Sequence, residues 1–404
     1  MPVAPDPEGA PLGRTLALNA YWLPLALQDA ALLAIAVPAE LVHFAPTNYR
    51  NNYAVLVSLV ALVNTLLPPV AGGISDRLRR IGSQRRSIVF VGAVLNVGGL
   101  ALMARANSTL GLGVFLILAC VGQTVAVAAY QAMLPENVAR AAWGIASGVR
   151  GAATLVGTVA GLALASIAAP QTVFIVTAAL AATGALALLP LHETVRQEAD
   201  HATIRDWHDF IVVFIARSFV TFGLTLLMTF VLYFFRDVLH AGNASAGTGL
   251  VGLAALGGAA VSSIFLGRLS DRFSRKIIVA LAGLPMTLAA VGFAVFPRES
   301  DVLAFAILFG LGYGGVLSTG WALALDSMPQ LGDVGRDLGI WGLATHVPAV
   351  IAPLIGAALL AAYGGSIDGY RALFALAALA FAIGSTSVLA VRGKVRSALP
   401  KCNA

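Results

Sequence analysis

The sequence predicts an all-α integral membrane protein with twelve transmembrane helices in two pseudo-symmetric six-helix bundles. Hydrophobic residues make up 59% of the 404 residues and charged residues only 11%, against about 25% charged residues in soluble domains. The mean hydropathy is +0.87, and one charged phrase occurs twice, almost half the chain apart. The long apolar runs exclude a soluble domain and the alternating strands of a membrane β-barrel.

Twelve apolar segments, separated by clusters of glycine, proline and charged residues, predict the helices. Each segment is long enough to cross the hydrocarbon core of a bilayer, which is about 30 Å thick. In chain order they cover residues 16–41, 53–75, 87–104, 109–134, 143–168, 171–190, 210–236, 247–267, 276–296, 302–325, 338–361 and 371–391.

Basic residues predict the orientation of these helices. Most of the 25 Lys and Arg residues fall in loops on the same side as both termini, and positively charged loops are typically cytoplasmic. We therefore expect both termini in the cytoplasm and the protein in the plasma membrane. The Ala- and Gly-rich composition indicates a bacterial inner membrane. The net charge of +6 follows from this topology and does not indicate nucleic-acid binding.

Two copies of one charged phrase divide the chain into halves. "GGISDRLRR" begins at Gly72 and "GRLSDRFSRK" at Gly267, so each lies between the second and third helices of its half. The longest polar segment, residues 191–209, follows the sixth helix. We expect an N-terminal bundle over residues 1–190, a cytoplasmic linker over 191–209, and a C-terminal bundle with a short cytoplasmic tail over 210–404.

The residue types in this phrase suit a contact between helices near the cytoplasmic surface. Gly72 and Gly267 carry no side chain, so another helix can approach closely. Asp76 and Asp271 follow about one turn later, where a carboxylate can face the N-terminus of another helix and gain about 0.3–1 kcal/mol. The alternative is that the basic residues of the phrase only set the membrane topology.

The repeated phrase resembles the signature of the major facilitator superfamily, and the resemblance covers nearly the whole chain. The second copy fits closely, with Ser274 where glycine is usual, whereas the first is longer, "SDRLRRIGSQRRSIV". This longer form, "YQAMLPENV" and "FRDVL" are similar to the cation-coupled sugar symporter branches. The resemblance implies that Asp76 faces the eleventh helix and Asp271 the fifth, and that these contacts hold an inner gate shut. The expected gating residues are Gly72, Asp76, Arg77, Gly267, Asp271, Arg272 and Arg275.

Ionisable residues inside the apolar segments are costly to bury, so we expect them to have a function. Asp29 lies near the middle of the first segment and is expected to bind a proton or cation, with a structural buried acid as the alternative. Arg150 and His346 occupy nearly equivalent positions in the two halves. Arg150 is expected to pair with Asp29 or to bind an anionic substrate group, and His346 to bind a proton or to pack as a hydrogen-bonding ring. Arg217 faces either the cavity or the inner surface.

Neutral polar and aromatic residues complete the expected substrate cavity. Trp321 and Tyr313, two turns apart, suit stacking against a sugar or another ring, although internal packing is the alternative. The whole expected set is Gln28, Asn64, Gln123, Arg150, Arg217, Tyr313, Trp321 and His346.

Together these features predict a secondary transporter that moves a small polar organic solute, such as a sugar, by alternating access with proton symport. The chain lacks a phosphate-binding loop and any catalytic, thiol or metal-ligand spacing, so we expect no enzyme activity, metal or cofactor. Its expected partners are the solute, protons and the lipid bilayer, and the functional unit is a monomer. Proton-coupled efflux of an amphiphilic or drug-like compound is the alternative, although the fifth helix lacks the proline-containing glycine motif of the family's antiporters. A non-transporting membrane receptor is the remote alternative.

Overall fold

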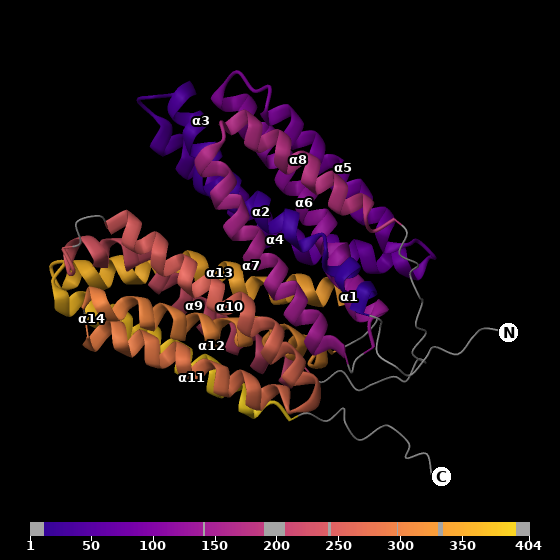
Figure 1. The fold of residues 1–404 in the computed structure, drawn as a ribbon. Helices are drawn as coiled ribbons and strands as arrows, with labels where there is room; N and C mark the ends of the chain where they lie inside the picture. Colours follow the sequence, from indigo (N-terminus) through magenta and orange to yellow (C-terminus); the bar gives the residue numbers. More distant parts are fainter. Residues whose placement is uncertain are drawn as a thin grey trace, which may run out of the picture.

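The computed structural model describes residues 12–139, 142–189, 207–240, 244–296, 298–329 and 334–392. These residues are almost entirely helical, and Figure 1 shows them in two bundles that meet at one end and diverge at the other. Among the described residues, eleven helices are long and apolar enough to cross a membrane, and a shorter apolar helix covers Pro170–Leu186. The predicted all-α membrane fold of twelve helices is confirmed, and eleven of these helices are candidate spans.

The N-terminal bundle is built from the first eight α-helices and a short π-helix. The elements are α1 (Leu12–Asn19), α2 (Trp22–Ala31), the π-helix η1 (Leu32–Ala36), α3 (Val37–Phe44), α4 (Tyr49–Arg80), α5 (Arg85–Met103), α6 (Thr109–Asn137), α7 (Trp143–Ile167) and α8 (Pro170–Leu186).

The C-terminal bundle contains the remaining six α-helices and a terminal 3₁₀ turn. The elements are α9 (His208–Asp237), α10 (Ala244–Arg272), α11 (Arg275–Val295), α12 (Glu299–Asp326), α13 (Val334–Ala362), α14 (Ile367–Ser387) and the 3₁₀ turn η4 (Val388–Ala390).

The first span differs from the continuous helix that its hydropathy predicts. A turn after Asn19 separates α1 from α2, and η1 separates α2 from α3. The hydroxyl of Tyr53, on α4, donates a 2.6 Å hydrogen bond to the Leu33 carbonyl within η1. π-helical turns inside α-helices are often found at functional sites. Because η1 begins three residues after Asp29, this part of the first span is a candidate functional site.

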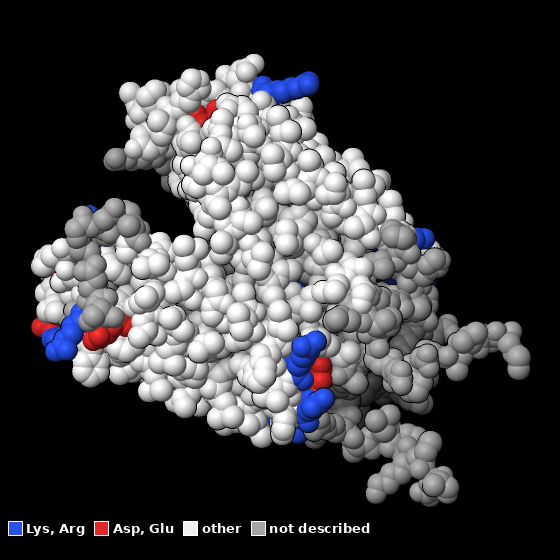
Figure 2. All heavy atoms as spheres, viewed as in Figure 1, with Lys and Arg blue, Asp and Glu red and all other residues white. Residues whose placement is uncertain are grey.

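The outer surface of both bundles suits a lipid environment. Many large apolar side chains are exposed along the helices, for example Leu66, Val261 and Leu354. Figure 2 shows the basic and acidic residues gathered at the two ends of the molecule, with a broad uncharged belt between them. Lipid can solvate such a belt, whereas water would penalise its exposure.

Two pairs of helices make the most extensive contacts between the bundles: α4 packs on α13, and α7 packs on α10. Glycines allow the close approach in both pairs. A Cβ atom at Gly72 would collide with the carbonyl oxygen of Gly335, and one at Gly267 would lie 2.6 Å from the carbonyl oxygen of Gly144. Any larger residue at Gly72 or Gly267 would therefore push the bundles apart.

The bundles close at one end of the molecule and separate at the other. We call the end where α4 and α10 finish the closed end, and the end that carries α3 the open end. The first described helix starts at the closed end and α14 finishes there (Figure 1). At the open end, the space-filling view in Figure 2 shows a hollow between the two bundles.

Candidate functional site

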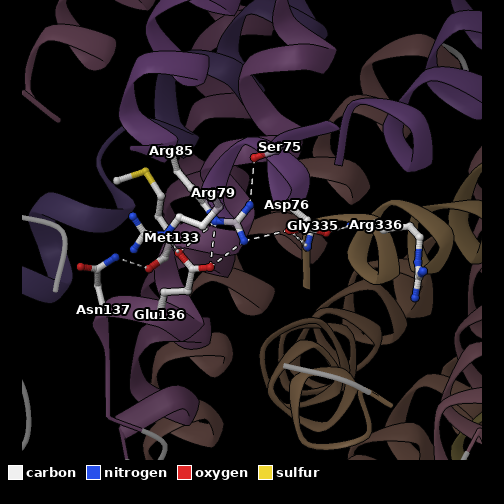
Figure 3. A network of polar contacts seen from close by, with 9 residues as sticks. All are labelled: Ser75, Asp76, Arg79, Arg85, Met133, Glu136, Asn137, Gly335 and Arg336. Atoms are coloured by element: carbon white, nitrogen blue, oxygen red, sulfur yellow. Dashed lines mark hydrogen bonds and ion pairs between the residues drawn. The ribbon is translucent and has the colours of Figure 1, made fainter. Parts of the chain in front are cut away.

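Asp76 joins the two bundles at the closed end. Its carboxylate accepts hydrogen bonds from the backbone N–H groups of Gly335 (3.0 Å) and Arg336 (2.8 Å) in the first turn of α13. The side chain is 2% exposed. These N–H groups have no partner within their own helix, and the positive end of the helix dipole favours a carboxylate there. Figure 3 shows Asp76 pointing at the start of α13.

Arg85 supports this carboxylate from within the N-terminal bundle. Its Nη2 atom donates to Asp76 Oδ1 (2.9 Å) and to Glu136 Oε1 (2.6 Å), and its Nη1 atom donates to Ser75 Oγ (2.9 Å). Arg85 is only 1% exposed. A cation buried this deeply needs such complete pairing, because an unpaired charge there would cost several kcal/mol.

Asp271 makes the equivalent contact on the other side of the interface. Its two carboxylate oxygens accept hydrogen bonds from the N–H groups of Gly144 (2.7 Å) and Ile145 (2.8 Å) at the start of α7. Arg275 supports it, donating to Asp271 (3.1 Å) and to Asp326 (2.7 Å). Asp76 therefore binds the start of α13 and Asp271 the start of α7, the two helices that the resemblance implied.

The two supporting clusters share one spacing. Glu136 follows Arg85 by 51 residues, and Asp326 follows Arg275 by 51 residues. Arg85 lies nine residues after the acid it supports, whereas Arg275 lies four residues after its own. The inserted residues of the first phrase therefore lengthen α4 and its turn without changing the contact.

The remaining basic members of the expected gating set lie at the surface. Arg77 and Arg272 are exposed near the ends of α4 and α10. Their positions suit the topological role of basic residues in loops.

Asp29 lies in a polar cluster between α2, α4 and α6, and its side chain is exposed to the surrounding space. Its Oδ1 atom accepts a 2.8 Å hydrogen bond from Gln123 Nε2, and Gln28 Nε2 donates to Gln123 Oε1 (2.9 Å). With Asn64, these residues line a cavity of about 30 Å³, which has room for one or two water molecules or a small cation. The cavity is too small for an organic solute.

Arg150 lies against aromatic rings of both bundles. Its Cζ atom is 4.1 Å from the ring centroid of Trp22, on α2, and 4.4 Å from that of Trp321, on α12. Within the described part of the chain, Arg150 and Asp29 do not form an ion pair, and Asp29 instead accepts a hydrogen bond from Gln123. Among the described residues, no side chain or carbonyl accepts a hydrogen bond from the Arg150 guanidinium. Among the contacts of the described residues, cation–π interactions thus hold this group.

Arg217 turns into the protein towards α13. Its Cζ atom lies 5.4 Å from the Trp341 ring centroid, and its Nε atom is 3.4 Å from Thr345 Oγ1. The charge of Arg217 also interacts with Arg150 and with His346. These three basic groups therefore share one central region, to which both bundles contribute.

The two aromatic candidates of α12 are separated in the structure. Tyr313 stacks on Phe309, with ring centroids 5.8 Å apart and an interplanar angle of 14°, within the apolar core of the C-terminal bundle. Trp321 contacts Arg150 instead. The rings thus form no common stacking surface in this conformation.

Sequence reasoning missed three residues that complete these sites: Trp22, Arg85 and Glu136. For Arg85 and Glu136 a signal was present, since an Arg and an acid recur at the same spacing in each half. For Trp22 there was none, because a tryptophan in an apolar helix is usually a packing residue.

Comparisons with known proteins agree with the fold. The family model described as Major Facilitator Superfamily matches residues 25–259 and 213–401. The Escherichia coli fucose:proton symporter FucP superposes with a TM-score of 0.74, at 12% identity, over 94% of this chain and 98% of that one.

Curated relatives are similar over shorter or more divergent stretches. The gentisate transporter of Corynebacterium glutamicum is 29% identical over 142 residues, or 35% of this chain and 31% of that protein. The niacin transporter NiaP of Acinetobacter baylyi is 35% identical over 98 residues, or 23% and 22%. The multi-drug resistance efflux pump PmrA homolog of Lactococcus lactis is 26% identical over 321 residues, or 75% and 76%. The chain thus spans less than a third of the length of the first two.

The family model covers most of the chain, and the helices form the matching fold. The chain therefore belongs to the Major Facilitator Superfamily and is a multi-pass membrane protein of the secondary transporter class, not an enzyme.

Proposed function

We propose that this transporter carries a small organic anion, bound by Arg150, together with a proton bound by Asp29. The observation that carries the proposal is the environment of Arg150, which contacts both bundles while no described residue accepts its hydrogen bonds. A cation in a membrane interior is costly without a counter-charge. A bound anion would supply that charge, and a site between the bundles suits alternating access.

Two further observations favour an anion over the neutral sugar that the sequence suggested. Arg217 lies close enough to Arg150 for their charges to interact, and a sugar would leave both charges uncompensated. The gentisate and niacin transporters, which are partial relatives, carry the names of carboxylic acids that are anions at neutral pH.

Proton coupling is assigned to Asp29. Its carboxylate is the acid of the polar cluster in the N-terminal bundle and accepts a hydrogen bond from a neutral amide, Gln123. It can therefore gain and lose a proton without breaking an ion pair. His346, whose ring interacts electrostatically with Arg217, is the second candidate for proton binding. A monovalent anion carried with one proton moves no net charge across the membrane.

The gate is assigned to the two helix contacts at the closed end. We place this end in the cytoplasm, because most basic loops lie on the side of both termini. The conformation then has its cytoplasmic gate shut by Asp76 and Asp271 and its cleft open outward. Residues 1–190 and 210–404 would rock as two bodies; most of the linker over 191–209 lies outside the described residues.

Efflux of an amphiphilic compound is the second candidate function. Of the three relatives named above, the one aligned over 75% of this chain is a homolog of a multi-drug efflux pump. Aromatic rings near a cleft would also suit such a compound.

Transport into proteoliposomes with an imposed pH gradient tests the proposal. A thermal-shift panel of carboxylates, sugars and cationic dyes first selects the tightest ligand. We expect this ligand to be a carboxylate. When the outside is acidic, it should accumulate to a higher level than in protein-free liposomes. An imposed membrane potential should not change its accumulation. Binding of sugars or dyes without carboxylates, or extrusion of a dye by the same gradient, would instead support another function.

Three variants separate the assigned roles. Arg150→Gln should lose carboxylate binding. Asp29→Asn should still bind and exchange the carboxylate but should not concentrate it. Glu40→Gln is the matched control, because Glu40 lies in the same span but bonds to Gln171, on α8, away from the cluster. Accumulation by Asp29→Asn at the wild-type level would remove Asp29 from the coupling role.

A further inference from the structure

Trp22 and Trp321 present flat surfaces to Arg150, and both rings are held in place. Trp22 packs on Tyr130, with ring centroids 5.2 Å apart, and Tyr130 is anchored by a 2.5 Å hydrogen bond from its hydroxyl to the Leu18 carbonyl. Trp321 is 3% exposed and belongs to an apolar core cluster that spans both bundles. The two rings therefore act as fixed walls.

The Arg150 Cζ atom lies over both indole rings, at distances where an arginine side chain commonly stacks face to face on an aromatic ring. In this stacked arrangement the edge of the guanidinium remains for a ligand. A guanidinium stacked on aromatic rings has its faces covered, while its N–H donors point outward in the plane of the group. A carboxylate that accepts two of these bonds lies in the same plane. The part of the ligand next to the carboxylate must then also lie near this plane, beside the two indole rings.

We infer that the site selects planar carboxylates, in which the carboxylate is conjugated to an aromatic ring or a double bond, and that Trp22 and Trp321 set this specificity. An aromatic carboxylate is flat through its ring, so it continues the plane of the guanidinium and can contact the indoles. A carboxylate on a tetrahedral carbon projects substituents out of this plane, towards the walls. The inference rests on the proposed function, since it refines which anion Arg150 binds.

The two tryptophans come from different bundles, so the binding of a planar ligand would involve both bundles. Trp22 belongs to the N-terminal bundle and Trp321 to the C-terminal bundle. A flat ligand at the Arg150 edge would touch both bundles at once. A ligand that is excluded from this plane could pair with Arg150 but would not contact both walls.

Three ligands of similar size separate planarity from charge. Benzoate is flat and anionic, cyclohexanecarboxylate is anionic but not flat, and benzamide is flat but neutral. With the purified full chain, we expect benzoate to bind about tenfold more tightly than cyclohexanecarboxylate, the scale of a good aromatic contact. Benzamide should not bind measurably. The measurement is a titration by isothermal calorimetry or by thermal shift.

Variants of Trp22 and Trp321 are compared by the ratio of their affinities for benzoate and cyclohexanecarboxylate. A general loss of folded protein leaves this ratio unchanged. Trp22→Leu and Trp321→Leu should each lower the preference for benzoate over cyclohexanecarboxylate towards one, whereas Trp22→Phe and Trp321→Phe should keep most of it. Trp22 is partly exposed, so its variants remain informative if the buried Trp321 tolerates no change. Arg150→Lys keeps the charge but loses the planar fork, and should also lower the ratio.

The outcomes distinguish this inference from the function on which it rests. Equal affinity for benzoate and cyclohexanecarboxylate in the wild type would overturn planar selection and leave anion transport standing. An unchanged preference in both leucine variants would also overturn it. If benzamide binds as well as benzoate, or if neither carboxylate binds while a sugar does, the anion proposal itself fails.

Discussion

Replacing Asp76 by asparagine should open the closed end of the molecule. Asp76 accepts two backbone hydrogen bonds from the first turn of α13 and a third from Arg85 Nη2. Asparagine keeps one acceptor oxygen but places an NH₂ group against a second donor. It also removes the charge that interacts with the helix dipole.

The size of the effect follows from these contacts. Each hydrogen bond to a charged group contributes roughly 1.5–3 kcal/mol, and the neutral bond that remains contributes roughly 1 kcal/mol. The two bonds to α13 together contribute roughly 3–6 kcal/mol, so the closed end should lose about 2–5 kcal/mol. Since about 1.4 kcal/mol corresponds to a factor of ten, the ratio of closed to open molecules should fall about 30-fold to 4,000-fold.

The assay is a distance measurement between spin labels across the closed end. Ile81, after α4, and Phe273, after α10, are 76% and 59% exposed, so cysteines there should accept labels once Cys120 and Cys402 are replaced. The wild type should give a short distance, and Asp76→Asn should add a population at longer distance.

A matched control and a double variant decide the result. Glu136→Gln alters a residue that bonds to Arg85 within the same bundle, so it should open the end less than Asp76→Asn does. Combining Asp76→Asn with Asp271→Asn should open it more than either change alone. If the folded double variant keeps the wild-type distance distribution, the helix contacts do not hold this end shut.

Three further changes have expected outcomes. Gly72→Ala should open the closed end in the same label experiment, because its methyl group would collide with the facing carbonyl oxygen; Gly73→Ala, whose Cβ would have its nearest neighbours at 4.0 Å, should not. Arg85→Ala should lower the thermal unfolding temperature strongly, since stranding buried acids costs roughly 3–5 kcal/mol; wild-type stability would show that the ion-pair network is dispensable. Tyr53→Phe should remove roughly 1–2 kcal/mol by leaving the Leu33 carbonyl unpaired, and faster hydrogen exchange in η1 should accompany the loss.

Hydropathy located the helices because every helix that crosses a bilayer must be apolar over the width of the hydrocarbon core. A helix in lipid needs about 20 apolar residues, whatever its neighbours are. The ends were less predictable: α4 continues to Arg80, beyond the predicted limit at residue 75, because a helix can leave the membrane and continue in polar sequence. The break at η1 was also invisible, since its residues are as apolar as those around it.

The internal repeat predicted one partner of each contact between an acid and a helix start. Asp76 and Asp271 were identified from the repeated phrase, and the resemblance implied the helices that they face. Arg85 was not assigned to Asp76, because it lies nine residues after it while Arg275 lies four residues after Asp271. Local spacing in the sequence does not report which side chains meet after an insertion.

The central site was predicted least completely. Asp29 and Arg150 were selected because charge is costly in a membrane, and pairing between them was one expected arrangement. The structure instead places Gln123 at Asp29 and two tryptophans at Arg150. Trp22 lies far from Arg150 in the sequence, and no pattern within its own helix marks it.

The sequence by itself determined that this chain lies in a membrane, where its apolar helices lie, and that its halves repeat. These properties depend on solvation and on local composition, which each segment carries independently of the others. Only the tertiary structure decided which end is closed, which helix start each acid binds, and what surrounds Arg150. Those choices depend on contacts between distant segments, and their energies differ by only a few kcal/mol between alternative packings of the same helices.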